Sequence, residues 1–259
     1  MKKALFILLS LLIGGKYAFA QDENELKNFR FGLRTGGMLC WYKPDDKKKF
    51  ESGGVTAKGS YGLMMEFRLN KVAVIATGLQ VDYDGGKLNM LDTNYYFLSK
   101  DDEFLSKEDT AGVPYDSYQL LSRQYNTTYI TIPFTMKLKT QEIGYFTYYG
   151  QFGLNNSIRL KSRVNDQDKT MSGGSADQTE LENTNDMNMF RFALNIGGGM
   201  EWNLSGSTSL VFGLNWYNGF SNVLKKESRY VFRTPFNDNE YVTQKATSNA
   251  VCLTIGVLF

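Results

Sequence analysis

The sequence has 259 residues, with 29 lysines and arginines, 27 aspartates and glutamates, no histidine, and 14% aromatic residues. The lack of histidine excludes Ser-His-Asp or Cys-His catalysis, His-ligated zinc and an imidazole pH switch. Two cysteines are too few for a disulfide scaffold or for a metal site made of cysteines alone. Helical membrane proteins need apolar stretches of about 18 residues or more, and the long apolar run of this sequence lies at its extreme N-terminus. We therefore expect no metal and no cofactor.

Residues 1–20 have the three parts of a secretory signal peptide. Lys2 and Lys3 precede a short apolar core, and small residues follow at Ala18 and Ala20. This pattern predicts export and cleavage before Gln21, which leaves residues 21–259 as one mature domain. Cleavage removes three of the 29 basic residues, so 26 remain against 27 acidic ones. A chain this close to neutral lacks the basic face that nucleic-acid binding needs.

Apolar and polar side chains alternate with a period of two in the mature chain, a pattern typical of β-strands with two different faces. We expect eight strands of about 10–13 residues, long enough to cross a bilayer when tilted. Their alternating positions include residues 29–41, 60–69, 75–83, 129–139, 146–155, 190–202, 209–216 and 250–259.

The connections between these strands alternate in length. Short turns are expected near residues 70–71, 140–143 and 205–206, whereas long polar loops are expected over about 42–58, 84–123, 161–188 and 220–246. This asymmetry is typical of bacterial outer-membrane barrels with both termini on the periplasmic side. Since hydrocarbon offers no partner to a free sheet edge, the eighth strand must pair with the first. Phe259 would then face outward, as a handle for the barrel-assembly machinery.

Alternation alone does not say which face points inward, because a soluble lipid-carrying barrel would show the same period. Three features favour apolar side chains outside. Glycines collect on the polar face, where a narrow lumen needs small residues. The apolar side chains are too many for one small cavity. Aromatic residues form two belts of the kind found at membrane interfaces: Trp41, Tyr61, Tyr83 and Trp216 near the loops, and Phe29, Phe67, Phe146, Trp202 and Phe259 near the turns. The sequence thus predicts an all-β protein, an eight-stranded antiparallel transmembrane β-barrel with short periplasmic turns and long extracellular loops.

Five segments carry motifs in a characteristic order and spacing: FRFGLRTGG at 29–37, YITIPF at 129–134, GQFG at 150–153, NIGGGME at 195–201 and GVLF at 256–259. Together they resemble the PorT-like outer-membrane β-barrel family of Bacteroidetes-type bacteria. The resemblance covers essentially the whole mature chain and implies an outer-membrane location in a Gram-negative cell. The founding member is associated with the type IX secretion system, so a secretion accessory role follows as an expectation. The family offers no catalytic residue that could be transferred.

Charged residues also fall on the face expected to line the lumen. They could line a narrow solute path, or they could form a salt-bridged plug, because charges removed from water need partners. Eight strands seldom leave a continuous channel, which favours the plug. The residues are Arg30, Arg34, Glu66, Arg68, Asp82, Lys137, Arg191 and Glu201.

Cys40 and Cys252 both fall on the lumen face of strands expected to be neighbours. An oxidising compartment permits a disulfide, but the bond requires Cα atoms within about 7 Å. That distance depends on the stagger of the strands, so the alternative of two small buried thiols stays open.

The expected loop over 84–123 combines aromatic side chains with two acidic clusters. The aromatic side chains could anchor a partner at the cell surface or could pack the loop onto the barrel rim. The carboxylates show no spaced calcium motif. The aromatic residues are Tyr95, Tyr96, Phe97, Phe104, Tyr115 and Tyr118, and the acidic ones are Asp101, Asp102, Glu103, Glu108 and Asp109.

We therefore expect a non-enzymatic outer-membrane barrel with a structural or interaction role at the cell surface, and a secretion-system accessory role as its most specific form. The alternative is a narrow, low-conductance pore for small solutes. Expected partners are outer-membrane lipid, the barrel-assembly machinery during insertion and secretion-system components, but no nucleic acid. A hydrolase built on a carboxylate pair is the remaining class, and no such pair stands out.

Overall fold

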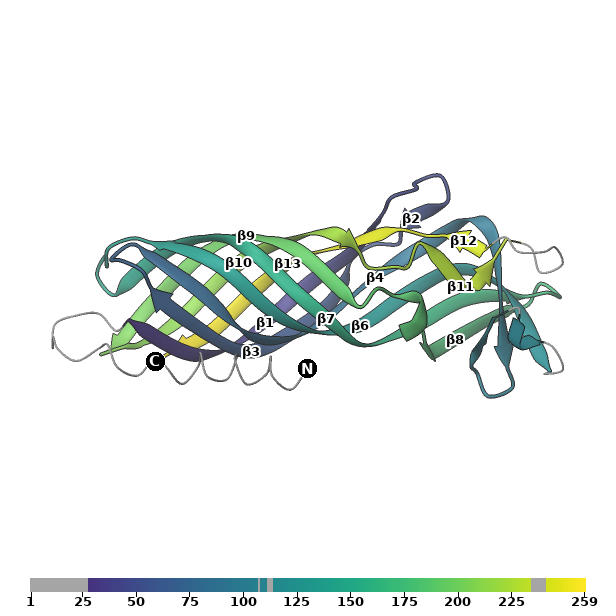
Figure 1. Ribbon diagram of the computed structural model, residues 1–259, viewed down its shortest axis with the longest axis horizontal. Helices are drawn as coiled ribbons and strands as arrows, with labels where there is room; N and C mark the ends of the chain where they lie inside the picture. Colours follow the sequence, from purple (N-terminus) through teal and green to yellow (C-terminus); the bar gives the residue numbers. More distant parts are fainter. Residues whose placement is uncertain (1–27, 107, 111–113, 234–240) are drawn as a thin grey trace, which may run out of the picture.

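Eight long strands form a closed antiparallel ring in the computed structural model, which describes residues 28–106, 108–110, 114–233 and 241–259 (Figure 1). The expected signal peptide and its cleavage site lie outside these residues. The ring consists of β1 (Phe29–Pro44), β3 (Thr56–Arg68), β4 (Ala73–Ser99), β6 (Tyr115–Lys139), β7 (Phe146–Thr170), β9 (Phe190–Ser205), β10 (Thr208–Asn222) and β13 (Ala246–Leu258).

Ring closure follows the predicted order. Each long strand pairs with the next along the chain, and β13 pairs with β1 from Gly32 opposite Leu258 to Pro44 opposite Ala246. The ring thus has no free edge, the condition for a sheet in hydrocarbon. The predicted fold class and the pairing of the eighth strand with the first are confirmed.

Tight turns join the strands at one end of the ring. The side-chain oxygen of Asn70 accepts hydrogen bonds from the backbone N–H groups of Val72 (2.8 Å) and Ala73 (2.7 Å), which fixes the β3–β4 turn. Gly144 and Gly206 take positive φ angles of 67° and 56° in the two other turns, a conformation that glycine adopts at little cost. Local sequence therefore specifies this end of the barrel.

Large apolar side chains cover the outside of the ring. Phe31 (57% exposed), Leu63 and Phe192 lie on the outer face, while neighbouring positions such as Met64 and Arg191 are buried inside. The outward direction predicted for the apolar face is confirmed. The structure therefore has the surface of a protein that is solvated by lipid.

Polar side chains on this outer face find partners on the neighbouring strand. The Thr77 hydroxyl donates to the carbonyl of Pro133 at 2.8 Å, and the Asn156 amide donates to the carbonyl of Ile132 at 3.2 Å. Since hydrocarbon supplies no hydrogen bonds, such pairing removes the cost of an unsatisfied group.

Glycines on the lumen face make room for larger side chains from across the barrel. A Cβ atom placed on Gly199 or Gly213 would come within 2.7 Å or 2.6 Å of the Tyr149 hydroxyl. The lumen is therefore filled by a few large residues that lie over glycines, as a narrow eight-stranded barrel requires.

The ring continues beyond its expected loop end as a β-sheet extension. β4 and β6 stay paired as far as Ser99 opposite Tyr115, and β6 and β7 as far as Tyr118 opposite Thr170. The bounds predicted for the loops at 84–123 and 161–188 were therefore wrong, because paired strands occupy much of both segments. The cause is that buried polar residues in these segments hide the alternation of apolar and polar positions on which strand prediction depends.

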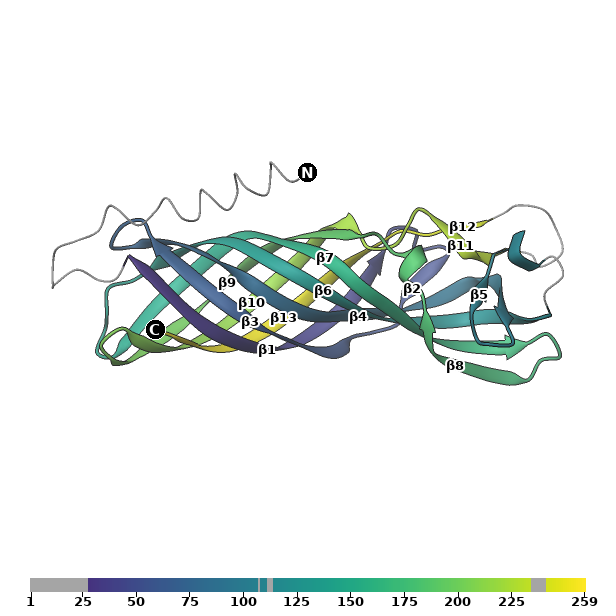
Figure 2. The ribbon, with the colours of Figure 1, turned by 60° about the horizontal axis from the view of Figure 1, so that its bottom comes forward.

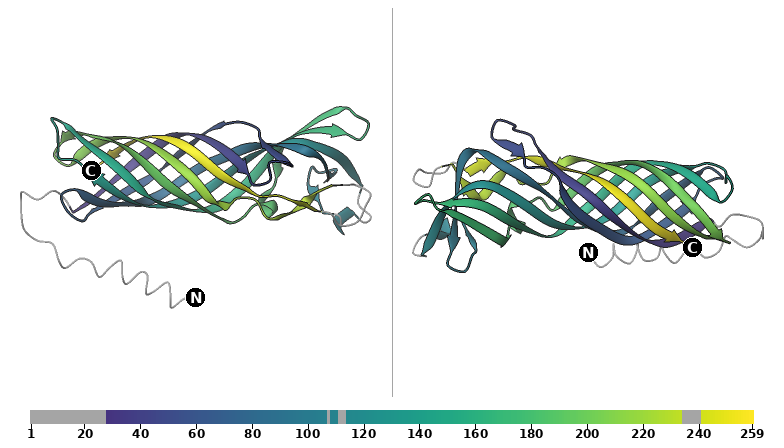
Figure 3. Two further views of the ribbon diagram at one scale, coloured as in Figure 1. Left: turned by 90° about the horizontal axis from the view of Figure 1, so that it is seen from above. Right: turned by 180° about the vertical axis from the view of Figure 1, so that it is seen from behind.

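Short elements complete the extension (Figures 1 and 2). The hairpin of β7 and β8 projects well past the ring (Figure 3). These elements are β2 (Phe50–Ser52), β5 (Phe104–Leu105), η2 (Glu108–Thr110), β8 (Ser175–Glu182), η3 (Thr184–Asp186), β11 (Glu227–Phe232) and β12 (Tyr241–Thr243). No helix in the part of the chain that the structure describes is long and apolar enough to cross a membrane.

Candidate functional site

The turn end of the lumen holds a lower charge cluster of Arg30, Glu66, Lys137, Lys139 and Glu201. The Glu66 carboxylate accepts hydrogen bonds from both lysine ammonium groups at 2.6 Å. Glu201 contacts Arg30 at 3.0 Å and Lys139 at 2.6 Å. β1, β3, β6 and β9 supply these residues, so the cluster joins strands from opposite sides of the ring.

Lys139 was not among the predicted lumen residues. It lies two residues after Lys137, on the same face of the strand, and is also buried. Period-two alternation was therefore the signal that could have identified it. Arg68 was predicted for the lumen and lies half-buried at the end of β3.

Apolar packing closes the space around the lower charge cluster. Lys137 Nζ lies 4.5 Å from the centre of the Tyr149 ring, a cation–π contact. Met64, Val211 and Leu258 form one buried cluster with Tyr149. The lumen at this level is therefore occupied by side chains.

A middle charge cluster of Arg191, Asp82 and Asp84 lies further along the lumen. Arg191 contacts Asp84 at 2.5 Å and Asp82 at 3.5 Å. Its guanidinium lies 4.3 Å from the centre of the Tyr129 ring, and the Ser248 hydroxyl donates to Asp84 at 2.5 Å. Asp84 was not predicted to be a lumen residue because it was assigned to a loop. It lies two residues after Asp82 and therefore on the same face of the strand.

Arg34 lies in the lumen among neutral partners. Its Nη2 donates to Thr254 Oγ1 at 3.0 Å and to the Tyr217 hydroxyl at 3.4 Å, and it lies 3.8 Å from Cys252 Sγ. Apart from Arg68, the predicted lumen residues are thus divided between two charge clusters and one arginine held by neutral groups.

Both cysteines are free thiols and buried. Cys252 is opposite Met38, whereas Cys40 is opposite Ala250. The stagger of β1 and β13 therefore separates the two cysteines by two positions along the ladder. Of the two alternatives left open by the sequence, the structure has the buried thiols.

An apolar cluster fills the loop end of the lumen and continues into the extension. Tyr96 is fully buried, stacks on Tyr118 at 5.7 Å and packs against Phe104 at 5.3 Å. These aromatic side chains pack against one another and against the apolar cluster, as the packing alternative expects, and Tyr96 is too deeply buried to be an exposed anchor. The buried members are Tyr42, Phe50, Leu88, Tyr96, Leu98, Leu120, Tyr125, Val164, Leu181, Met187, Val223, Leu224, Val231, Val242 and Ala246.

Buried charge also holds the extension together. Arg123 and Asp166 form a bidentate pair, with Nε to Oδ1 at 2.8 Å and Nη2 to Oδ2 at 2.5 Å. The guanidinium lies 4.9 Å from the centre of the Phe104 ring. The Tyr96 hydroxyl donates to Asp168. Burial raises the pKa of Asp168 to about 7, against the opposing effect of this hydrogen bond.

The residues of both predicted aromatic belts lie on the outer face. At the turn end Phe29 packs on Phe67 at 5.1 Å and Phe146 on Trp202 at 6.1 Å, while Phe259 packs on Phe31 at 5.7 Å. At the loop end Tyr61 and Tyr83 pack at 6.3 Å; Trp216 is exposed and Trp41 half-buried.

The spacing of the two belts agrees with a membrane-spanning band. Phe29 and Trp41 are twelve positions apart on β1. At about 3.3 Å per residue and a tilt of about 40°, they are separated by roughly 30 Å along the barrel axis. This is close to the thickness of a bilayer's hydrocarbon core.

The architecture defines a class of protein, an outer-membrane β-barrel with a side-chain-filled lumen. A family model described as "Outer membrane protein beta-barrel domain" matches residues 19–225, and the chain belongs to that family. Membership implies an outer-membrane location. No curated protein matches the sequence.

Solved outer-membrane proteins are similar at 10% sequence identity. Neisserial surface protein A has a TM-score of 0.37, with 88% of this chain and 95% of that chain covered. OprG of Pseudomonas aeruginosa has a TM-score of 0.44, with 92% and 98% covered. Ail, the attachment invasion locus protein of Yersinia pestis, has a TM-score of 0.33, with 90% and 100% covered.

Proposed function

We propose that this protein is a closed, non-enzymatic barrel that anchors a rigid β-sheet extension at the cell surface, in a structural or interaction role. The main support is the content of the lumen. Two charge clusters and an apolar cluster occupy it in succession, and their residues come from strands around the ring. Because long loops of such barrels face the exterior, the extension is the part that a partner meets.

The extension is suited to an interaction role because its conformation is fixed before binding. Strand pairing on both sides of the irregularity between Asn89 and Asn94, together with the buried Arg123–Asp166 pair, holds it in place. A preformed surface loses little conformational entropy when a partner binds. The resemblance to the PorT-like family supports a narrower proposal, that the partner is a component of a secretion system of type IX.

A narrow pore is the alternative, and unpaired polar atoms in the lumen favour it. Among the described residues, Arg30 Nη2 and Asp82 Oδ1 are buried without a hydrogen-bond partner. Water commonly satisfies such groups. A connected file of water molecules would let small ions pass between the charge clusters.

Conductance separates the closed barrel from the pore. We expect purified protein in planar bilayers to show no steady single-channel openings, because side chains fill the bore at three levels. Steady openings that disappear in Arg34→Gln or Arg191→Gln, but persist in Arg163→Gln on the exposed extension, would establish the pore instead. Turnover of lipid or peptide by the purified protein would contradict the non-enzymatic assignment.

A further inference from the structure

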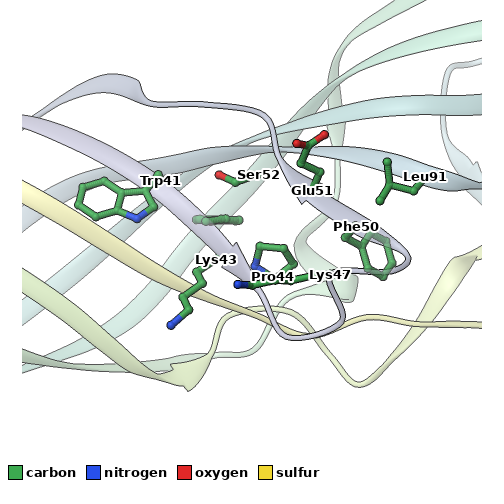
Figure 4. A pocket seen from close by; sticks show the side chains of 9 residues that line it. Trp41, Lys43, Pro44, Lys47, Phe50, Glu51, Ser52 and Leu91 are labelled. Atoms are coloured by element: carbon green, nitrogen blue, oxygen red, sulfur yellow. The ribbon is translucent and has the colours of Figure 1, made fainter.

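A pocket of about 620 Å³ opens on the outside of the barrel, between the end of β1 and the segment that carries β2 (Figure 4). It shares Tyr42 and Phe50 with the apolar cluster at the loop end of the lumen, while Lys43, Lys47, Glu51 and Leu91 are exposed. Its lining includes Trp41, Lys43, Lys47, Phe50, Glu51 and Leu91. The pocket thus combines apolar side chains with two ammonium groups and one carboxylate.

The position of the pocket along the barrel places it at a membrane interface. Trp41 belongs to the loop-side aromatic belt, at the upper edge of the band that begins at Phe29. Lys43 is two positions further along β1 on the same face and is exposed. Lysine side chains just above the hydrocarbon edge lie at the depth of lipid headgroups.

Backbone pairing makes this a preformed pocket. Residues 50–52 pair with residues 88–90 of β4. The N–H of Leu91 donates to the carbonyl of Lys49 at 2.9 Å, and the N–H of Gly53 donates to the carbonyl of Lys87 at 2.7 Å. The wall formed by the β2 segment is therefore fixed at both ends against β4.

Charge and polarity select one kind of occupant. Lys43 and Lys47 give the lining an excess of one positive charge over Glu51. Leu91 and nearby Val55 are both more than half exposed, so apolar surface continues beside the ammonium groups. An anionic headgroup with acyl chains attached meets both requirements, because its phosphate pairs with the lysines while its chains cover the apolar side chains.

We propose that this pocket binds a phosphorylated lipid of the outer leaflet, with Lys43 and Lys47 contacting the headgroup phosphate and with Trp41 and Leu91 contacting the chains. The proposal rests on the outer-membrane location of the barrel. It does not depend on whether the lumen conducts, so the bilayer recordings and the lipid experiment fail or succeed independently.

Native mass spectrometry of the protein in detergent tests the proposal, with diphosphoryl lipid A as the probe. We expect one bound lipid, and roughly tenfold weaker binding for each lysine removed, since a hydrogen bond to a charged group contributes about that much. The variants are Lys43→Ala and Lys47→Ala. Lys48→Ala is the matched control, because Lys48 is exposed in the same segment but does not line the pocket.

Two further probes test whether binding needs both the phosphates and the acyl chains of the lipid. The same lipid with both phosphates removed should bind at least tenfold more weakly, by the same charge argument, and inorganic phosphate alone should not compete. Equal binding of the phosphorylated and dephosphorylated lipids would overturn the proposal. So would unchanged binding in the Lys43→Ala/Lys47→Ala double variant, once its heat-dependent gel mobility shows that it is folded.

Discussion

Replacing Glu66 by glutamine should lower the free energy of unfolding by about 3–5 kcal/mol, the usual cost of breaking a buried ion pair. Glu66 accepts hydrogen bonds from Lys137 and Lys139 at 2.6 Å, and all three side chains are buried. In Glu66→Gln, both ammonium groups lose their shared counter-ion. Urea unfolding of the vesicle-reconstituted protein, followed by tryptophan fluorescence, measures the effect.

An exposed ion pair of the same length provides the control. Arg163 and Glu180 also lie 2.6 Å apart, but their side chains are about half exposed. Glu180→Gln should change the free energy of unfolding by less than about 1 kcal/mol. Equal losses in the two variants would show that burial of the lower charge cluster contributes nothing to the stability of the barrel.

Arg123→Met should release the extension while the ring stays closed. The substitution leaves the Asp166 carboxylate buried without its bidentate partner, which costs about 3–5 kcal/mol of local stability. It also removes the contact of the guanidinium with the Phe104 ring. Hydrogen exchange read by mass spectrometry should show faster exchange over residues 84–123 and 161–170, with the ring segments of β9, β10 and β13 unchanged.

Arg163→Met on the same strand as Asp166 is the matched control, since Arg163 is exposed and pairs with exposed Glu180. It should leave exchange in the extension as in the wild type. Accelerated exchange throughout the barrel in Arg123→Met would contradict the separation of extension and ring.

Alternation predicted the ring well because each of its faces meets a uniform environment. In β6, Ile132 and Phe134 face lipid while Thr131 and Thr135 are buried in the lumen. One face is then consistently apolar and the other polar, so the sequence shows on which face of the strand each residue lies.

The same rule failed where polar groups are buried at the loop end of the membrane band and in the extension. Asp84, Asp166 and Asp168 are all almost fully buried, yet in sequence they resemble loop residues. Their burial depends on partners such as Arg191, Arg123 and Tyr96, which are distant in the chain. No local sequence pattern predicts such long-range pairings.

The composition of the lumen was predictable, but its pairing was not. The sequence places Glu66, Lys137 and Glu201 on one face. The stagger of the strands decides that Glu66 contacts Lys137 and that Glu201 contacts Arg30. It also separates Cys40 from Cys252 along the ladder. Stagger is a property of the closed ring, so it becomes known only with the structure.

Spin labels at neighbouring positions of β3 test most directly that apolar side chains face lipid and polar ones face the bore. Labels at Leu63→Cys and Met64→Cys, in a background with Cys40 and Cys252 replaced by alanine, are compared in vesicles by their collisions with oxygen, which concentrates in lipid. The account predicts high oxygen accessibility at position 63, which is exposed on the outer face, and low accessibility at position 64, which is buried. The reverse order, or protein that stays dissolved without detergent, would contradict it.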